Sequence, residues 1–279
     1  MAETRNIKEI IQATMNAGET KANMPLVKMI LLGFMAGLFI AGGAAASSVI
    51  MHDIGNVGIA RLLGGACFPV GLMMIVLTGC ELFTGDTLMI IGLMDKRYKL
   101  SKMLRTLIVV YISNLIGSAI AALFVYLSGQ FGYTDNLLGA YTIKVALGKV
   151  SLTFSKAFFS GILCNIFVCL AVFMATASRE VSGKILGIFF PIMAFVVSGY
   201  EHCVANMYYI PAGILAAKDE VFAAKAQEVF GYTADQLRNL NIGNYLLKNL
   251  LPVSLGNIIG GMLFVGVIYY IAYGKEIKK

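Results

Sequence analysis

A few ionisable side chains stand inside long apolar stretches of this sequence. Glu81 and Asp86 interrupt one such stretch, and Glu201 and His202 interrupt another. An ionisable group at membrane depth is expensive, so it marks a substrate or proton pathway by default. Histidine adds a group whose unperturbed pKa of about 6.5 allows proton exchange near neutral pH. The chemistry expected at these positions is therefore the handling of a small charged or protonatable solute.

The two interruptions resemble each other. GCELFTGD at residues 79–86 and GYEHCVAN at residues 199–206 share a glycine in first place and a glutamate in third, and an acid faces an amide in last place. A second similarity follows each of them, NLIGS at residues 114–118 and NIIGG at residues 257–261. Two matched motifs in the same order predict an internal repeat.

The elements that must position these residues are membrane-spanning helices, each of which needs about 20 apolar residues. Four charge-free stretches meet this length, namely residues 29–51, 106–134, 157–178 and 249–274. Two further apolar stretches, residues 62–94 and 185–217, contain the acidic interruptions. We therefore expect six spans, of which the second and the fifth are broken.

Three spans in each half place the second half in the membrane in the opposite orientation to the first. A break leaves backbone N–H and C=O groups without partners, which is tolerated only where protein or a water-filled cavity satisfies them. The N-termini of half-helices carry partial positive charge and can hold an anion. The fold class expected is an all-α membrane protein of two inverted three-helix repeats, with a solute path at the paired breaks.

The composition agrees with a membrane protein. The chain is 58% hydrophobic and only 13% charged, whereas soluble domains are about 25% charged. The formal net charge of +7 is not concentrated in a basic run with aromatic residues, so no nucleic-acid partner is expected. Lysines and arginines are more frequent in the segments on the N-terminal side, which places both termini in the cytoplasm of a multi-pass inner (plasma) membrane protein. The five cysteines lie in apolar surroundings, and neither a metal site nor a cofactor is expected.

The expected organisation is a single transmembrane channel domain over residues 1–279. Its parts are a cytoplasmic N-terminal amphipathic helix (1–25), the first repeat (26–134), an outer linker (135–156), the second repeat (157–274) and a cytoplasmic tail (275–279). The i, i+3, i+4, i+7 pattern of the first helix is formed by Ile7, Ile10, Ile11 and Thr14. This helix either docks at the inner membrane surface or gates the inner mouth.

The residues at the breaks also have structural interpretations. His202 could be a neutral histidine hydrogen-bonded between helices. Glu81 and Glu201 could support the breaks by accepting loose N–H groups, or they could bind a cation. Asp86 and Asn206 are expected to cap the half-helices that resume after each break.

Two other polar residues leave the same choice open. Thr84 offers its hydroxyl to a substrate or to the local backbone. Lys149 stands in the expected outer linker among apolar residues, where it is either a solvated lysine or a group that attracts anions into a vestibule.

Three motifs resemble the signatures of the formate/nitrite transporter family. They are GCELFTG at residues 79–85, GILCNIFVCLA at residues 161–171 and SGYEHCVANM at residues 198–207. The resemblance implies an aquaporin-like protomer in a homopentamer with one pore per subunit. It implies a channel and not an enzyme, which carries small monovalent anions of weak acids, most of all formate, or else nitrite or hydrosulfide.

The resemblance also implies roles for individual residues. The substrate pathway it implies contains His202, Thr84, Asn165 and Lys149. The apolar constriction it implies on either side of the histidine contains Phe68, Leu72, Leu82, Phe83 and Phe195. Leu82, Phe83 and Thr84 correspond to a mobile loop in the second span.

The mechanism expected is passage of an anion that becomes neutral on the way. Lys149 and the half-helix ends attract the anion. The apolar rings exclude a hydrated ion, because the free-energy cost of removing its water is too high. Protonation, with His202 as donor or electrostatic partner, lets the solute cross as a neutral acid.

Three alternatives belong to other functional classes. The first is a cation or ammonium channel that uses Glu81, Glu201 and His202. The second is an intramembrane enzyme, for which the spans offer no nucleophile–histidine pair or metal-ligand spacing. The third is a structural or receptor protein, which gives no reason for two matched helix breaks.

Overall fold

The computed structural model describes residues 4–277, and this part of the chain contains helices but no β-strand. Six helical segments are long and apolar enough to cross a membrane. In chain order they are α2 (Leu26–Met51), α3 with α4 (Val57–Thr78), α7 (Leu100–Leu127), α9 (Phe154–Ala177), α10 (Val181–Ser198) and a final span (Ile242–Gly274). The expected all-α class with six spans is confirmed. Of the expected N-terminal segment and tail, residues 1–3 and 278–279 lie outside the described part.

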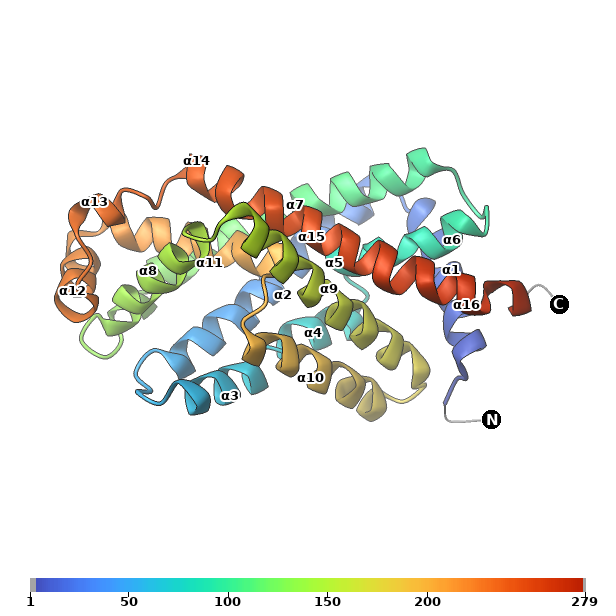
Figure 1. The fold of residues 1–279 in the computed structure, drawn as a ribbon, viewed down its shortest axis with the longest axis horizontal. Coiled ribbons are helices and arrows are strands. Elements are labelled where there is room, and N and C mark those ends of the chain that lie inside the picture. Colours follow the sequence, from blue (N-terminus) through green and yellow to red (C-terminus); the bar gives the residue numbers. More distant parts are fainter. Residues whose placement is uncertain (1–3, 278–279) are drawn as a thin grey trace.

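Shorter helices complete the spans or lie at their ends. They are α1 (Ile7–Ala22), α3 (Val57–Cys67), α4 (Val70–Thr78), α5 (Phe83–Asp86), η1 (Thr87–Met89), α6 (Ile90–Met94), η2 (Gln130–Gly132), α8 (Leu137–Val150), α11 (Cys203–Lys218), α12 (Glu220–Phe230) and α13 (Ala234–Leu237). The final span comprises α14 (Ile242–Asn244), η3 (Tyr245–Leu250), α15 (Leu251–Ile259), η4 (Gly260–Val267) and α16 (Ile268–Ile277), in which η3 and η4 are π-helical. In Figure 1, α1, α6 and α16 lie at one end of the molecule and α8, α12 and α13 at the other.

The second and fifth spans are broken where the sequence predicts. α4 gives way to Gly79 and α10 gives way to Gly199, and both glycines have φ +73°. This left-handed conformation is open to glycine without steric cost, and it ends a helix. The chain then runs without helix until α5 begins at Phe83 and α11 begins at Cys203.

A buried asparagine on α7 satisfies the backbone groups that the first break frees. The Asn114 amide nitrogen donates to the carbonyls of Gly33 on α2 (2.7 Å) and Glu81 (3.0 Å). Its amide oxygen accepts from the Phe83 N–H, the first of the resuming helix (2.9 Å). One side chain therefore joins two spans and both sides of the break.

Asn257 on α15 makes the same three bonds at the second break. Its amide nitrogen donates to the carbonyls of Gly161 on α9 (2.7 Å) and Glu201 (3.0 Å), and its oxygen accepts from the Cys203 N–H (2.9 Å). The two asparagines are the first residues of the NLIGS and NIIGG motifs. The two halves are thus structural repeats in their hydrogen bonding as well as in their spans.

Small residues allow the paired spans to approach closely. A Cβ atom on Gly117 of α7 would lie 2.1 Å from the carbonyl oxygen of Phe34 on α2. A Cβ atom on Gly256 of α15 would lie 2.1 Å from the carbonyl oxygen of Phe158 on α9. Close backbone approach at small residues is typical of helix pairs in membranes.

Each repeat is preceded by a shorter helix. α1 begins with a capping box formed by Asn6 and Glu9, and it buries Ile10, Ile11 and Met15 against the protein. This helix lies within residues 1–25, the segment expected to hold an N-terminal amphipathic helix. The interval expected as an outer linker instead contains α8, which packs against α11 and α12. α8 stands before the second repeat as α1 stands before the first.

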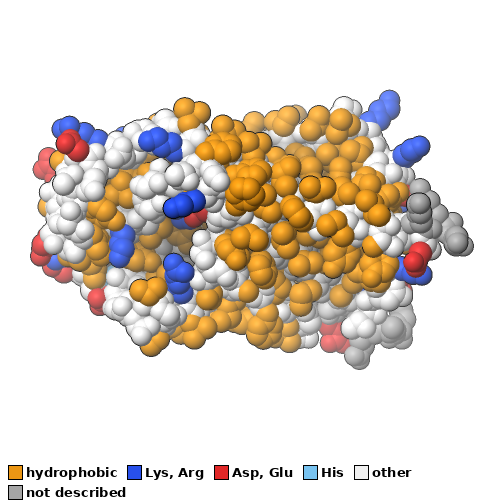
Figure 2. All heavy atoms as spheres, viewed as in Figure 1, with side chains coloured by type: hydrophobic (Ala, Val, Ile, Leu, Met, Phe, Trp, Pro, Cys, Tyr) orange, Lys and Arg blue, Asp and Glu red, His pale blue; other side chains and the backbone are white. Residues whose placement is uncertain are grey.

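The outer surface matches a bilayer. Figure 2 shows hydrophobic side chains gathered over the middle of one face, with lysine, arginine and acidic side chains towards its two ends. The exposed apolar residues include Phe190 on α10 and Phe264 in the final span. A soluble monomer rarely exposes so continuous an apolar surface, whereas lipid or neighbouring subunits cover one in a membrane protein.

We predict that Asn257→Ala lowers the stability of the protein strongly. The substitution leaves one buried N–H and two carbonyl oxygens with one hydrogen bond fewer each, and an unsatisfied buried group costs about 1–3 kcal/mol. Thermal unfolding in detergent, followed by circular dichroism, should show a clearly lower midpoint than the unsubstituted protein. The control is Gln227→Ala, which removes an amide from the exposed face of α12. Equal midpoints for the two variants would contradict this account.

Candidate functional site

A very small cavity lies at the centre of the protein, between the two breaks. Its volume is about 10 Å³, which is barely the room that one water molecule needs. Its walls are formed by Ile40, Phe68, Leu72, Leu82, Val168, Ile192, Phe195 and His202. Apart from the histidine, this central cavity is wholly apolar.

A larger cavity of about 180 Å³ lies beside it, towards α8, and we call it the α8 mouth. The two cavities share Phe68, Phe195 and His202 as walls. The two phenylalanine rings meet edge to face, 5.7 Å between centroids, where the two cavities adjoin. Lys149 and an arginine, Arg61, line the wider part of the α8 mouth.

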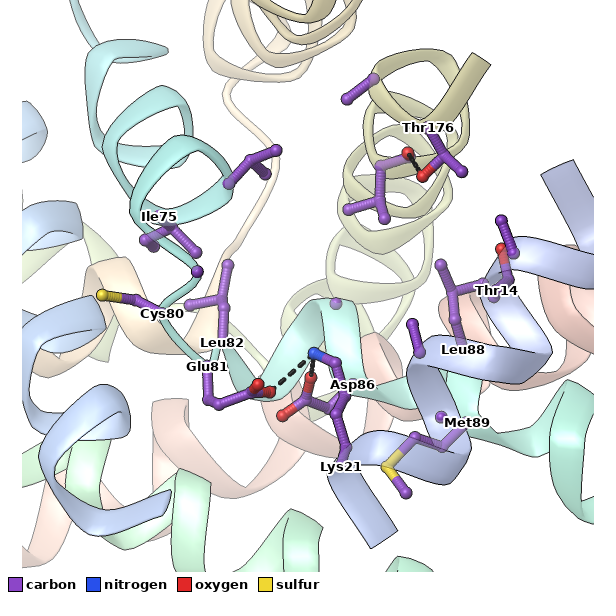
Figure 3. A pocket seen from close by; sticks show the side chains of 18 of the residues that line it. Thr14, Lys21, Ile75, Cys80, Glu81, Leu82, Asp86, Leu88, Met89 and Thr176 are labelled. Atoms are coloured by element: carbon purple, nitrogen blue, oxygen red, sulfur yellow. Dashed lines mark hydrogen bonds and ion pairs between the residues drawn. The ribbon is translucent and has the colours of Figure 1, made fainter. Parts of the chain in front are cut away.

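On the opposite side a cavity of about 380 Å³ opens towards α1, and we call it the α1 mouth (Figure 3). Its walls shared with the central cavity are Leu72 and Leu82. The charged residues that line it are Arg5, Lys21, Glu81, Asp86 and Lys184. Two charged mouths are therefore separated by an apolar passage with one histidine in it.

His202 has defined hydrogen bonds in the passage. It is the N-cap of α11, and its Nδ1 accepts from the Ala205 N–H at 3.1 Å. Its Nε2 lies 2.9 Å from the Thr84 hydroxyl oxygen. Because Nδ1 accepts a hydrogen bond, a neutral imidazole carries its proton on Nε2. This N–H then donates a hydrogen bond to the Thr84 hydroxyl oxygen. The ring is thus hydrogen-bonded between the two breaks and also faces the central cavity.

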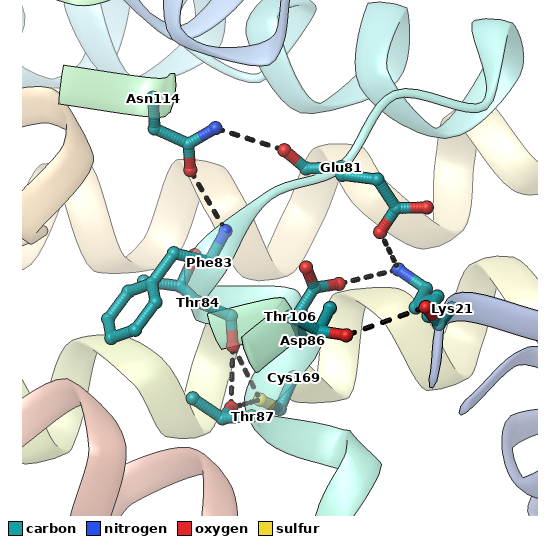
Figure 4. Close-up of polar contacts among 9 residues, drawn as sticks. All are labelled: Lys21, Glu81, Phe83, Thr84, Asp86, Thr87, Thr106, Asn114 and Cys169. Carbon is teal, nitrogen blue, oxygen red and sulfur yellow. Dashed lines mark hydrogen bonds and ion pairs between the residues drawn. The ribbon is translucent and has the colours of Figure 1, made fainter. Parts of the chain in front are cut away.

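Thr84 and Asn165 join the two repeats behind this cavity. The Thr84 carbonyl accepts hydrogen bonds from Thr87 and Cys169, which Figure 4 shows, and from the Asn165 amide (3.2 Å). The same amide donates to the carbonyl of Asn257 at 2.7 Å. Asn165 is buried and lines none of these three cavities, so its contact with the passage runs through Thr84.

Phe83 differs from the other residues of the expected constriction. Its ring packs edge to face on Tyr111 of α7, with 4.7 Å between the centroids. It lines neither mouth nor the central cavity, whereas Phe68, Leu72, Leu82 and Phe195 all do. The structure therefore places Phe83 in the packing of the first break and not in the constriction.

Lys149 in the wall of the α8 mouth belongs to an ordered set of polar side chains, the α8 cluster, which also includes Glu201, Asn206 and Asn249. The Lys149 ammonium donates to Glu201 Oε1 at 2.9 Å. The other carboxylate oxygen accepts from Asn206 at 2.6 Å and from Asn249 at 3.3 Å. Lys149 is thus neither a solvated loop residue nor a free cation, because it is the partner of a buried carboxylate.

The α1 mouth contains a related set, the α1 cluster, formed by Lys21, Glu81 and Asp86 (Figures 3 and 4). The Lys21 ammonium lies 2.6 Å from Glu81 Oε2 and 2.5 Å from Asp86 Oδ1. Burial alone would lower the pKa of the Lys21 ammonium, but the charges of Asp86 and Glu81 outweigh burial and raise that pKa above its usual value. Lys21 therefore remains protonated.

These contacts revise two expectations about the breaks. Asp86 and Asn206 do not cap the resuming helices, because α5 has Leu82 as its N-cap and α11 has His202. The carboxylates of the two break glutamates bind lysines, while their carbonyls accept from the asparagine amides. Helix-break support thus comes from the backbone of the glutamates, and their side chains order the mouths.

Lys21 is a residue of the candidate site that sequence reasoning missed. In the sequence it is only one of several positive residues near the N-terminus. The signal that could have found it is spacing, because Lys21 precedes Gly33 by the same interval at which Lys149 precedes Gly161. The two glycines accept the equivalent asparagine bonds, so the two lysines are equivalent positions of the repeat.

Comparisons with known proteins agree with this arrangement. The family model described as "Formate/nitrite transporter" matches residues 8–271. The "Probable formate transporter" of Methanothermobacter thermautotrophicus is 38% identical, with 92% of this chain and 93% of the relative covered. "Formate channel FocA" of Escherichia coli (strain K12) is 34% identical, with 93% and 91% covered. A solved structure described as "Pentameric formate channel with formate bound" has a TM-score of 0.80 and 35% identity, with 89% of this chain and 97% of that chain covered.

The match extends over nearly all of the spans, and both breaks lie within it. The relatives are transport proteins and not enzymes. This chain is a multi-pass membrane protein that belongs to the formate/nitrite transporter family.

Proposed function

We propose that this protein is a membrane channel for small monovalent anions of weak acids, with formate as its main substrate. The observation that carries the proposal is the passage itself, in which two mouths that each hold a lysine are separated by a central cavity of about 10 Å³. A formate channel among the relatives and a solved structural neighbour with bound formate support the choice of anion.

The mouths concentrate anions, and the passage excludes their hydrated form. Arg61 and Lys149 on one side, and Lys21 with its neighbours on the other, provide cationic groups at cavity walls. Between them the rings of Phe68 and Phe195 leave no room for a hydration shell. Since a bare charge in an apolar slot is prohibitively unstable, the anion crosses as its neutral acid.

His202 assists as a hydrogen-bond donor. Its Nε2–H points at Thr84 and can be offered to an acid that enters the central cavity. A second proton on Nδ1 would break the bond from the Ala205 N–H, because Nδ1 could no longer accept it. The ring therefore orients the acid and stabilises its polar end, while the proton that neutralises the anion comes from the water of the mouths. Proton and anion then move together.

The pore belongs to a larger assembly in this proposal. The solved structural neighbour is a pentameric channel. A homopentamer of this chain, with one pore per subunit, would likewise cover part of the apolar belt. The whole chain forms a single channel domain in the cell's inner membrane. The excess of positive residues near the α1 end supports a cytoplasmic position of both termini.

A cation or ammonium channel is less compatible with the contacts. Such a channel would need Glu81 and Glu201 as open ligands, but each of these buried carboxylates is paired with a half-buried lysine. Nitrite and hydrosulfide remain as alternative main substrates, because both are small anions of weak acids and meet the same steric limit.

We predict that His202→Phe lowers formate flux in proteoliposomes by about 2- to 10-fold. The substitution keeps a ring in the central cavity but removes the donor, and a hydrogen bond between neutral groups is worth about 0.5–1.5 kcal/mol. Radiolabelled formate uptake measures the effect. The control is His52→Phe, since His52 at the end of α2 is hydrogen-bonded to Val49 and Thr134 and lines none of the three cavities. Unchanged formate flux in the His202→Phe variant would contradict the proposed role of His202 as a hydrogen-bond donor to the solute.

We predict that Phe68→Leu lets larger weak acids such as lactate through, because it widens the constriction at the α8 mouth. The ratio of lactate to formate uptake should rise severalfold. Phe83→Leu is the matched control, as its ring packs on Tyr111 outside the passage. If the two variants change this selectivity ratio equally, the assignment of the constriction is wrong.

A further inference from the structure

The two mouths differ by one charge at equivalent positions. Asp86 is the last residue of the first break motif, and Asn206 takes its place in the second. The α8 cluster therefore holds one ammonium and one carboxylate, whereas the α1 cluster holds one ammonium and two carboxylates. Lys21 can neutralise only one of its two partners, so the α1 cluster carries either a surplus negative charge or a bound proton.

The environment of Asp86 shows where that proton fits. The residue is 1% exposed, and its Oδ2 is buried without a hydrogen-bond partner among the described residues. The Glu81 and Asp86 carboxylates bind the same Lys21 ammonium, at 2.6 Å and 2.5 Å, so they are neighbours. Two neighbouring carboxylates favour the uptake of one proton, which would then serve as a hydrogen-bond donor between them. At the other mouth the Asn206 amide supplies this donor to Glu201 permanently. A proton on the Asp86–Glu81 pair would reproduce that bond.

Of the titratable groups around Asp86, Lys21 is the only one among the described residues that forms an ion pair with its carboxylate. These groups are Lys21 on α1, Glu81 in the break, Tyr98 before α7, Cys169 on α9, and Arg5 and Lys184 at the cavity wall. The Tyr98 hydroxyl donates to the Met89 carbonyl, and the Arg5 guanidinium donates to the Thr176 carbonyl. The Lys21 ammonium binds the carboxylates of both Glu81 and Asp86 (Figure 3).

We propose that the Asp86–Glu81 pair makes passage sensitive to the pH on the α1 side, because the pair takes up one proton and its surplus negative charge repels anions when that proton is lost. The inference rests on the proposed anion channel. Solute moving in either direction must pass the α1 mouth, so the response depends on the pH of that side and not on the direction of flux. The α8 mouth, with Asn206, has no such response.

The test compares Asp86→Asn with the unsubstituted protein in membrane vesicles of known orientation. Formate flux is measured while the pH of one side is varied from mildly acidic to mildly alkaline and the other side is held constant. The lipid leak is measured in protein-free vesicles and subtracted, and the ratio of the two remaining fluxes then cancels the titration of formate itself. With α1-side pH varied, we expect the Asp86→Asn variant to be faster by roughly tenfold at alkaline pH, as one unit charge nearby allows. The ratio should approach one as the pH falls.

The control reverses the asymmetry. Asn206→Asp places the extra acid in the α8 cluster, beside Glu201, and combined with Asp86→Asn it should move the pH response to the α8 side. A ratio that does not change with the pH of the α1 side overturns the proposal.

A second measurement separates this inference from the proposed function and needs no transport. Infrared difference spectra of the purified protein should show the C=O stretching band of a protonated carboxyl group that appears on acidification and is absent from Asp86→Asn. If the unsubstituted protein shows no such band, proton uptake by the pair is disproved. A protein that shows the band but carries no formate retains the proton site and loses the proposed substrate.

Discussion

The structure depends on one constraint, that a helix broken inside a membrane must find partners for its freed backbone groups within the protein. Asn114 and Asn257 meet it in the same way, each with bonds to the break glutamate carbonyl, to the first N–H of the resuming helix and to a glycine carbonyl on the facing span. Because these bonds fix both ends of each break, they also fix what the breaks present to the centre of the protein. The passage is therefore a consequence of how two interruptions are stabilised.

Because both repeats stabilise their break with an asparagine in the same way, the protein is approximately symmetric. The side chains that could act on a solute lie at positions where the two repeats differ. The N-cap of the resuming helix is Leu82 in the first repeat and His202 in the second, and both line the central cavity. One copy thus contributes an apolar wall and the other a hydrogen-bond donor. The polar clusters also differ at one equivalent position, which is held by Asp86 in the α1 cluster and by Asn206 in the α8 cluster.

The sequence predicts the spans and breaks because both depend on local properties, namely the length of charge-free stretches and the glycines at which helices end. The roles of single residues depend on contacts between distant segments, which no local pattern contains. Lys21 meets a carboxylate sixty residues further along the chain, and Phe83 packs on Tyr111 of α7. Asp86 was expected to cap a helix, but the helix restarts before it and leaves its carboxylate free to bind the lysine.

The paired charges at the mouths make sense for a pore rather than for stability. A buried ion pair gains little net stability, because removing both charges from water costs about as much as their attraction returns. A pore must admit its solute and also release it, so a binding site at its mouth has to be weak. An unpaired lysine at each cavity wall would bind an anion tightly. A lysine whose charge is compensated by a glutamate still offers hydrogen-bond donors but attracts the anion more weakly. The lysine–glutamate pairs therefore suit the mouths of a path that small anions enter and leave from either side.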